Sequence, residues 1–177
     1  MKKYVLAMGL AAVATLSHAQ FKGSIEKVME EMGDFSPENN TFQVVRAKPL
    51  HIRLAARIMG TNMPEHTKEE VLRAVVYGVY RTFIHTDQAQ VQVTAQPLLV
   101  TLGGKDNKLL DTPHATVTVT RAKALQVAQK TLGVKSFKEL VDSDDTWSDK
   151  MQNGRYFTRK PGLAKLAHDL GVVYVGK

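Results

Sequence analysis

The sequence predicts a single α+β domain, in which a small, mostly antiparallel sheet of about three to four strands packs with about four to five helices. Two patterns and one absence lead to this fold class. Apolar residues recur at helical spacing in some segments and alternate with polar residues in others. No repeat, low-complexity block or long linker divides residues 20–177. Strands and crossover helices do not alternate strictly, which disfavours a doubly wound sheet.

Residues 1–19 have the three parts of a secretory signal peptide. Two lysines precede an uncharged apolar stretch, and Ser17 and Ala19 place small residues before a cleavage site at Gln20. The stretch is shorter than the ~20 residues that a membrane-spanning helix needs. No cysteine follows it, so a lipoprotein is excluded. We therefore expect a periplasmic or secreted protein with no transmembrane segment in its mature part, residues 20–177.

The net charge and the amino-acid composition limit the kinds of partner and of chemical site that the protein can have. The formal net charge is +7, and it falls to +5 when the two lysines of the leader are removed. This mild positive charge favours anionic partners. The chain has no cysteine, which excludes disulfides, thiol nucleophiles, iron–sulfur clusters and cysteine-ligated zinc.

The mature chain opens with a predicted helix and strand. Ser24 is placed to cap a helix over 24–32, and Gly33 ends it. A loop of polar residues with Pro37 follows. Residues 41–47 are then predicted to form a strand.

Residues 50–59 fit two patterns, because their apolar side chains match both the alternation of a strand and the stripe of a helix. Pro49 stands at a first-turn position, good helix formers fill the segment, and Gly60 follows it. These features favour a helix.

The clearest predicted element is a helix over residues 67–84. Thr67 and Glu70 form a capping-box pattern at its start. One continuous apolar stripe then runs to Ile84, and the charged residues, including Arg73 and Arg81, are predicted on the opposite face.

The second half of the chain predicts a hairpin and further helices. Strands at 91–96 and 115–119 are joined by a long connection with a glycine-rich turn at 103–107. A helix over 121–132 ends at Gly133.

The remaining residues predict four short elements. A second capping box, Ser136 with Glu139, opens a short turn. An acidic loop, Asp142–Asp149, surrounds Trp147. A helix over 163–170 and a terminal strand over 172–175 complete the chain.

His85, Asp87 and His114 are the strongest candidates for catalysis. Two imidazoles and a carboxylate suit zinc if the hairpin folds toward the end of the preceding helix. The alternative is structural: His85 lies at a helix C-terminus, where the dipole favours a cation, and Asp87 begins a turn. Because the spacing fixes no ligand geometry, we predict no catalytic residue, metal or cofactor. The serine-elbow, phosphate-loop and calcium-loop patterns are also incomplete.

Basic residues form two groups without an acid among them. The first contains Arg46, Lys48, Arg53 and Arg57, and the second spans 150–165 with two aromatic residues between its cations. Arginines pair with phosphates or carboxylates, and aromatic rings stack on flat ligands. We predict partner-binding residues in the second group: Arg155, Tyr156, Arg159 and Lys160.

Two functions remain open from the sequence. The first is a periplasmic, non-enzymatic binding or accessory protein of an envelope-associated assembly. Its partner would be an envelope protein, an anionic glycan or a lipid headgroup, and the compartment disfavours nucleic acid. The second is a small secreted metal-assisted hydrolase that uses His85, Asp87 and His114.

Overall fold

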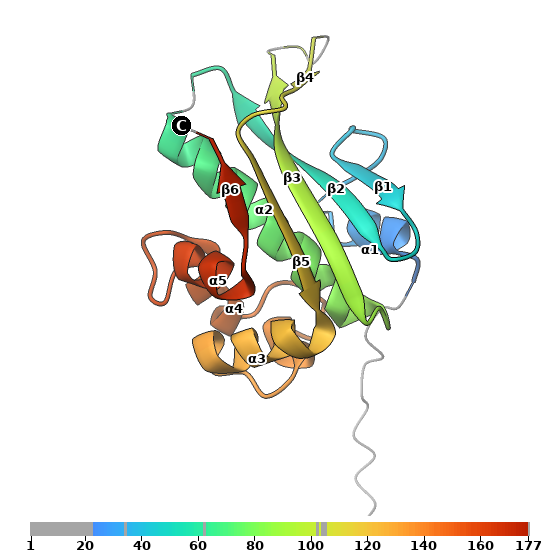
Figure 1. The fold of residues 1–177 in the computed structure, drawn as a ribbon, viewed down its shortest axis with the longest axis vertical. Helices are drawn as coiled ribbons and strands as arrows, with labels where there is room; N and C mark the ends of the chain where they lie inside the picture. Colours follow the sequence, from blue (N-terminus) through green and yellow to red (C-terminus); the bar gives the residue numbers. More distant parts are fainter. Residues whose placement is uncertain (1–22, 34, 62, 102, 104–105, 177) are drawn as a thin grey trace, which may run out of the picture.

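Figure 1 shows the computed structural model, which describes residues 23–176 apart from 34, 62, 102, 104 and 105. The predicted signal peptide, 1–19, lies outside the described residues. The described chain forms one α+β arrangement, in which five α-helices and a 3₁₀ turn pack with a six-stranded sheet. None of the helices in this part of the chain is long and apolar enough to cross a membrane.

The sheet has the order β1-β2-β3-β5-β6, with β4 paired to β3 (Figure 1). Strands β2 and β3 are parallel, whereas every other pair is antiparallel. The predicted sheet of about three to four mostly antiparallel strands is therefore too small, and its parallel pair was not foreseen. The bounds are β1 Phe42–Arg46, β2 His51–Met59, β3 Gln90–Val100, β4 Lys108–Leu109, β5 His114–Thr120 and β6 Val173–Val175.

The prediction of a helix at residues 50–59 is wrong, because this segment is strand β2. Its even-numbered apolar side chains, such as Ile52 and Leu54, are fully buried against the helical layer. Its odd-numbered side chains, such as Arg53 and Arg57, point to the other face of the sheet. Alternation outweighs helix propensity here because β2 gains a strand partner on each side.

Helix α2, Pro64–His85, is the central helix and connects β2 to β3 as a crossover. It begins earlier than predicted, with Met63 as its N-cap and Pro64 in its first turn. Thr67 therefore lies inside the helix, and the predicted capping box does not form there. Arg81 is only 2% exposed, so the side of the helix opposite the apolar stripe is itself buried at this position.

A glycine lets α2 lie close to the sheet. A Cβ atom at Gly78 would stand 2.6 Å from Leu54 Cδ1 and 2.9 Å from Val93 Cγ1. Both neighbours are fully buried. The backbone of α2 therefore approaches β2 and β3 at a distance that leaves no room for a side chain at this position.

The other helices follow α2 on the same side of the sheet. Figure 1 places α1, Ile25–Glu31, beside β1, and gathers α3, α4 and α5 near one end of the sheet. Ser24 caps α1 by accepting a hydrogen bond from the Lys27 N–H, as predicted. Among these helices, α3 spans Arg121–Leu132, α4 spans Asp149–Arg155 and α5 spans Leu163–Leu170.

Helix α4 was not predicted, because residues 149–155 fall at the end of the expected acidic loop and in the second basic group. Met151 and Gly154 are its buried residues, and Gly154 packs against Leu166 and Leu132. The predicted capping box at Ser136 does not form. The Ser136 side chain caps nothing among the described residues, whereas the Glu139 carboxylate accepts a hydrogen bond from the Lys135 N–H.

Candidate functional site

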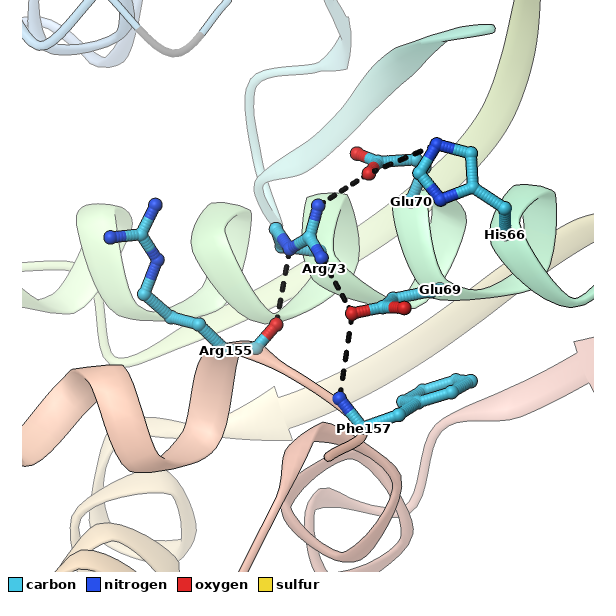
Figure 2. Close-up of polar contacts among 6 residues, drawn as sticks. All are labelled: His66, Glu69, Glu70, Arg73, Arg155 and Phe157. Carbon is cyan, nitrogen blue, oxygen red and sulfur yellow. Dashed lines mark hydrogen bonds and ion pairs between the residues drawn. The ribbon is translucent and has the colours of Figure 1, made fainter. Parts of the chain in front are cut away.

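The predicted partner-binding residues lie in one segment, residues 155–160, which we call the basic segment. It begins at Arg155, the last residue of α4, and leads to α5. Figure 2 shows that Arg73 of α2 holds the start of this segment. Its Nε donates a hydrogen bond to the Arg155 carbonyl at 3.1 Å. Its two Nη atoms pair with Glu70 at 2.5 Å and Glu69 at 2.7 Å.

Glu69 makes a second attachment for the basic segment. Its Oε1 accepts a hydrogen bond from the Phe157 N–H at 3.4 Å as well as the ion pair from Arg73 (Figure 2). The backbone is thus tied to α2 at residues 155 and 157. Arg73 is 16% exposed and Glu69 is 20% exposed, so water screens these contacts only partly.

The tied part of the basic segment also stacks on α2. The Tyr156 ring lies close to two guanidinium groups, with its centroid 5.1 Å from Arg73 Cζ and 5.6 Å from Arg155 Cζ. Arg155 also lies over the Tyr77 ring at 5.3 Å and donates a hydrogen bond to Gln152. Arg155 and Tyr156 therefore contribute mainly to packing within the molecule.

The outward charge of this region comes from Arg159 and Lys160. Both are exposed, and neither forms an ion pair within the described part of the chain. The two neighbouring lysines are neutralised, Lys150 by Glu139 and Lys165 by Asp169. The hydrogen bond from Lys165, with those from His168 and Thr131, lowers the pKa of Asp169 to about 2.

A polar cavity of about 430 Å³ lies on the other side of Arg73. It is bounded by the end of α1, the loop before β1, the outer edge of β2 and one face of α2. Arg57 and Arg73 line it together with Glu30 and Glu70. Because charges of both signs line this cavity, it has no clear preference for an anion.

The structure does not bring His85, Asp87 and His114 together. His85 is fully buried at the C-terminal end of α2, and Asp87 follows it. His114 begins β5 and contacts the Asp111 carbonyl at 3.0 Å, whereas the other end of β5 pairs with the start of β3. The length of β5 separates the two sites by about 20 Å. Within the described residues, no group of three histidines, cysteines or carboxylates could hold a metal.

The first basic group lies on a different surface. Arg46 ends β1, and Arg53 and Arg57 belong to β2. The odd-numbered side chains of β2, Arg53 among them, lie on the face of the sheet away from α2, whereas the basic segment is attached to α2. The two basic groups therefore do not share one face of the molecule.

A polar row that the sequence analysis did not assign to a site crosses this same sheet face. His51 Nε2 lies 3.0 Å from Thr94 Oγ1, which lies 3.2 Å from Thr116 Oγ1. Burial and the nearby Arg46 guanidinium lower the pKa of His51. In the sequence, the alternation of Gln and Thr with valine in β3 and β5 indicates a solvent-exposed face of the sheet, but it does not indicate which side chains form the row.

Comparison of the chain with protein-family models, curated proteins and solved structures finds no match.

Proposed function

We propose that the chain is an exported, non-enzymatic accessory protein of an envelope-associated assembly, and that it binds an anionic partner through the basic segment. The partner is an envelope protein, an anionic glycan or a lipid headgroup. One observation carries this proposal: Arg159 and Lys160 are exposed without an ion pair in the described chain, while the lysines beside them are neutralised.

The attachment of the segment to α2 supports the same function. Arg73 and Glu69 hold the backbone on which the two outward cations stand. A segment that is already ordered loses less conformational entropy when it binds a partner. Guanidinium and ammonium groups on such a support favour carboxylates or phosphates.

Charge reversal tests the basic segment. The double variant R159E/K160E is expected to reduce capture of the partner from an envelope extract about tenfold or more at low salt. Capture by the unchanged protein is expected to fall as salt rises, because exposed charges are screened. The control K123E/K130E changes the net charge by the same amount on exposed positions of α3. Equal capture by both variants would remove the basic segment from consideration.

The proposed export of the protein is tested separately. Intact-mass measurement on protein recovered from the periplasm is expected to show a chain that begins at Gln20, without residues 1–19. Recovery of the uncut chain from the cytosol would contradict the export proposal, whatever the result for the basic segment.

A further inference from the structure

Among the described strands, the face of the sheet opposite α2 carries arginines and no carboxylate side chain. We define this open face by the polar outward side chains of four strands: Gln43, Arg46, His51, Arg53, Arg57, Gln92, Thr94, Gln96, Thr116 and Thr118. Neither aspartate nor glutamate occurs in any strand of the sheet. In Figure 1, no helix of the described chain lies over this face.

The register of the strands sets these side chains in rows. His51 lies beside Gln92, which lies beside Thr118. In the next row Arg53 lies beside Thr94, and Thr94 beside Thr116. Adjacent strands are about 4.8 Å apart, so each row offers polar groups at regular intervals across the sheet.

Hydrogen bonds hold part of this surface in place. Arg46 donates to the Pro49 carbonyl at 3.1 Å and to Gln92 Oε1 at 3.4 Å. His51 contacts the Thr94 hydroxyl at 3.0 Å. A ligand that meets these groups therefore finds them already oriented, which lowers the entropy cost of binding.

Two arginines on β2 lack a partner for their charge. Arg53 Nε is buried and makes no hydrogen bond with the described residues. Arg57 stands at the outer edge of β2, where it borders the polar cavity as well as this face; it is exposed and has no ion pair in the same part of the chain. They are four residues apart on one strand, so their Cα atoms are about 13 Å apart. A buried donor without an acceptor is costly, so a carboxylate that reaches Arg53 stabilises the complex strongly.

We propose that the open face binds a linear acidic polysaccharide. The carboxylates of the polysaccharide pair with Arg53 and Arg57. Its hydroxyl groups form hydrogen bonds with the Gln and Thr side chains of β3 and β5. This adds a second binding surface to the proposed function, with a named partner chemistry. The two surfaces are tested by separate variants.

The composition of the open face favours this ligand over other polyanions. It has no aromatic side chain on which the bases of a single-stranded nucleic acid could stack. Strands β3 and β5 have neighbours on both sides, so a peptide lying over them finds no main-chain groups to pair with. Sugar hydroxyls, in contrast, are both donors and acceptors and match the amide and hydroxyl groups present.

The direct test measures binding of an alginate oligosaccharide to the purified protein by titration calorimetry. The double variant R53Q/R57Q is expected to bind about tenfold more weakly or worse. The variant K123Q/K130Q, which removes the same charge from exposed positions of α3, is expected to change the affinity less than about twofold. A matched melting temperature confirms that each variant is folded, and Arg57→Gln alone serves if the double variant is not.

Two further measurements separate sugar recognition from simple charge attraction. The substitution Thr94→Val removes a hydroxyl without changing charge, and it is expected to weaken alginate binding several-fold. Equal losses for the two charge variants, or no loss for R53Q/R57Q, would overturn the proposal. Tighter binding of a single-stranded oligonucleotide or of polyglutamate than of alginate would overturn the choice of ligand.

Discussion

Arg73 shows how one side chain can position a distant segment. It is held by two glutamates of its own helix and donates to the Arg155 carbonyl, 82 positions further along the chain. The same guanidinium stacks on Tyr156. The order of the basic segment therefore depends on a residue of α2 that has no outward charge role of its own.

Replacing Arg73 with methionine is expected to loosen the basic segment. The substitution keeps an apolar stem but removes the charged hydrogen bonds, and the expected destabilisation is about 1–3 kcal/mol. Chemical denaturation measures this loss, and trypsin should cleave faster at Arg159. The exposed control Arg57→Met should lie within about 0.5 kcal/mol of the unchanged protein. An unchanged cleavage rate in the Arg73 variant would contradict the attachment described here.

His51 gives the molecule a pH-dependent stability term. Burial and Arg46 lower its pKa below the ordinary value of 6.5, so the folded state binds a proton less readily than the unfolded state. The contribution is fully present above pH 6.5 and is lost as the pH falls through that value and below it. His51→Gln should therefore lose less thermal stability than the unchanged protein between about pH 7.5 and pH 5.5. His114→Gln is the control, and an identical slope in the His51 variant would contradict this account.

At the scale of elements, the predictions that held are those with local signals. Helices α1 and α3 have a polar N-cap and a glycine stop, and their bounds agree closely with expectation. The hairpin of β3 and β5 was predicted from alternation alone. These signals succeed because capping and one-sided burial are decided by residues close together in the sequence.

The failures concern elements whose identity depends on distant partners. Residues 51–59 satisfy both periodicities, and only their position between β1 and β3 decides for a strand. Residues 149–155 have a weak pattern of their own and become helical where Gly154 packs against Leu166 and Leu132. Propensity is outweighed by tertiary packing in both cases.

The sequence predicts which types of residue the candidate site contains, but not how they are arranged. Clustered cations at 155–160 were visible in the sequence, but the packing of Arg155 and Tyr156 against α2 was not. The open face was still less visible, because its members come from four strands. The sequence shows that its arginines are clustered. Their alignment with Thr94 and Thr116, however, follows only from the register of β2 on β3 and of β3 on β5.

The contact between α2 and the sheet is an element-scale test of packing. Gly78→Ala introduces a Cβ within 2.6 Å of Leu54 Cδ1. Overpacking costs about 1–3 kcal/mol, and the better helix propensity of alanine returns up to about 1 kcal/mol. The expected net destabilisation is about 1–2 kcal/mol in denaturant unfolding. At Gly60 the nearest atom to an added Cβ is 3.8 Å away, so Gly60→Ala should be nearly neutral.

At the scale of the whole molecule, the sheet separates two positively charged surfaces. The basic segment is attached to α2, and the open face lies on the far side of β2 and β3. One molecule could therefore contact anionic groups on two sides at once. Such bivalent contact would raise its effective affinity for an extended assembly beyond that of either surface alone.

The connectivity of the sheet also implies an uneven resistance to local opening. Strands β2 and β3 and the helix between them are contiguous in the chain and hold the most deeply buried residues, whereas β6 is a three-residue edge whose Val173 is 58% exposed. Amide hydrogen exchange should therefore be slowest in α2 and β3 and fastest along β6. Uniform protection would contradict this gradient. Strand β6 can therefore open locally and admit solvent, or pair with a strand of another molecule, while the centre of the sheet keeps its native fold.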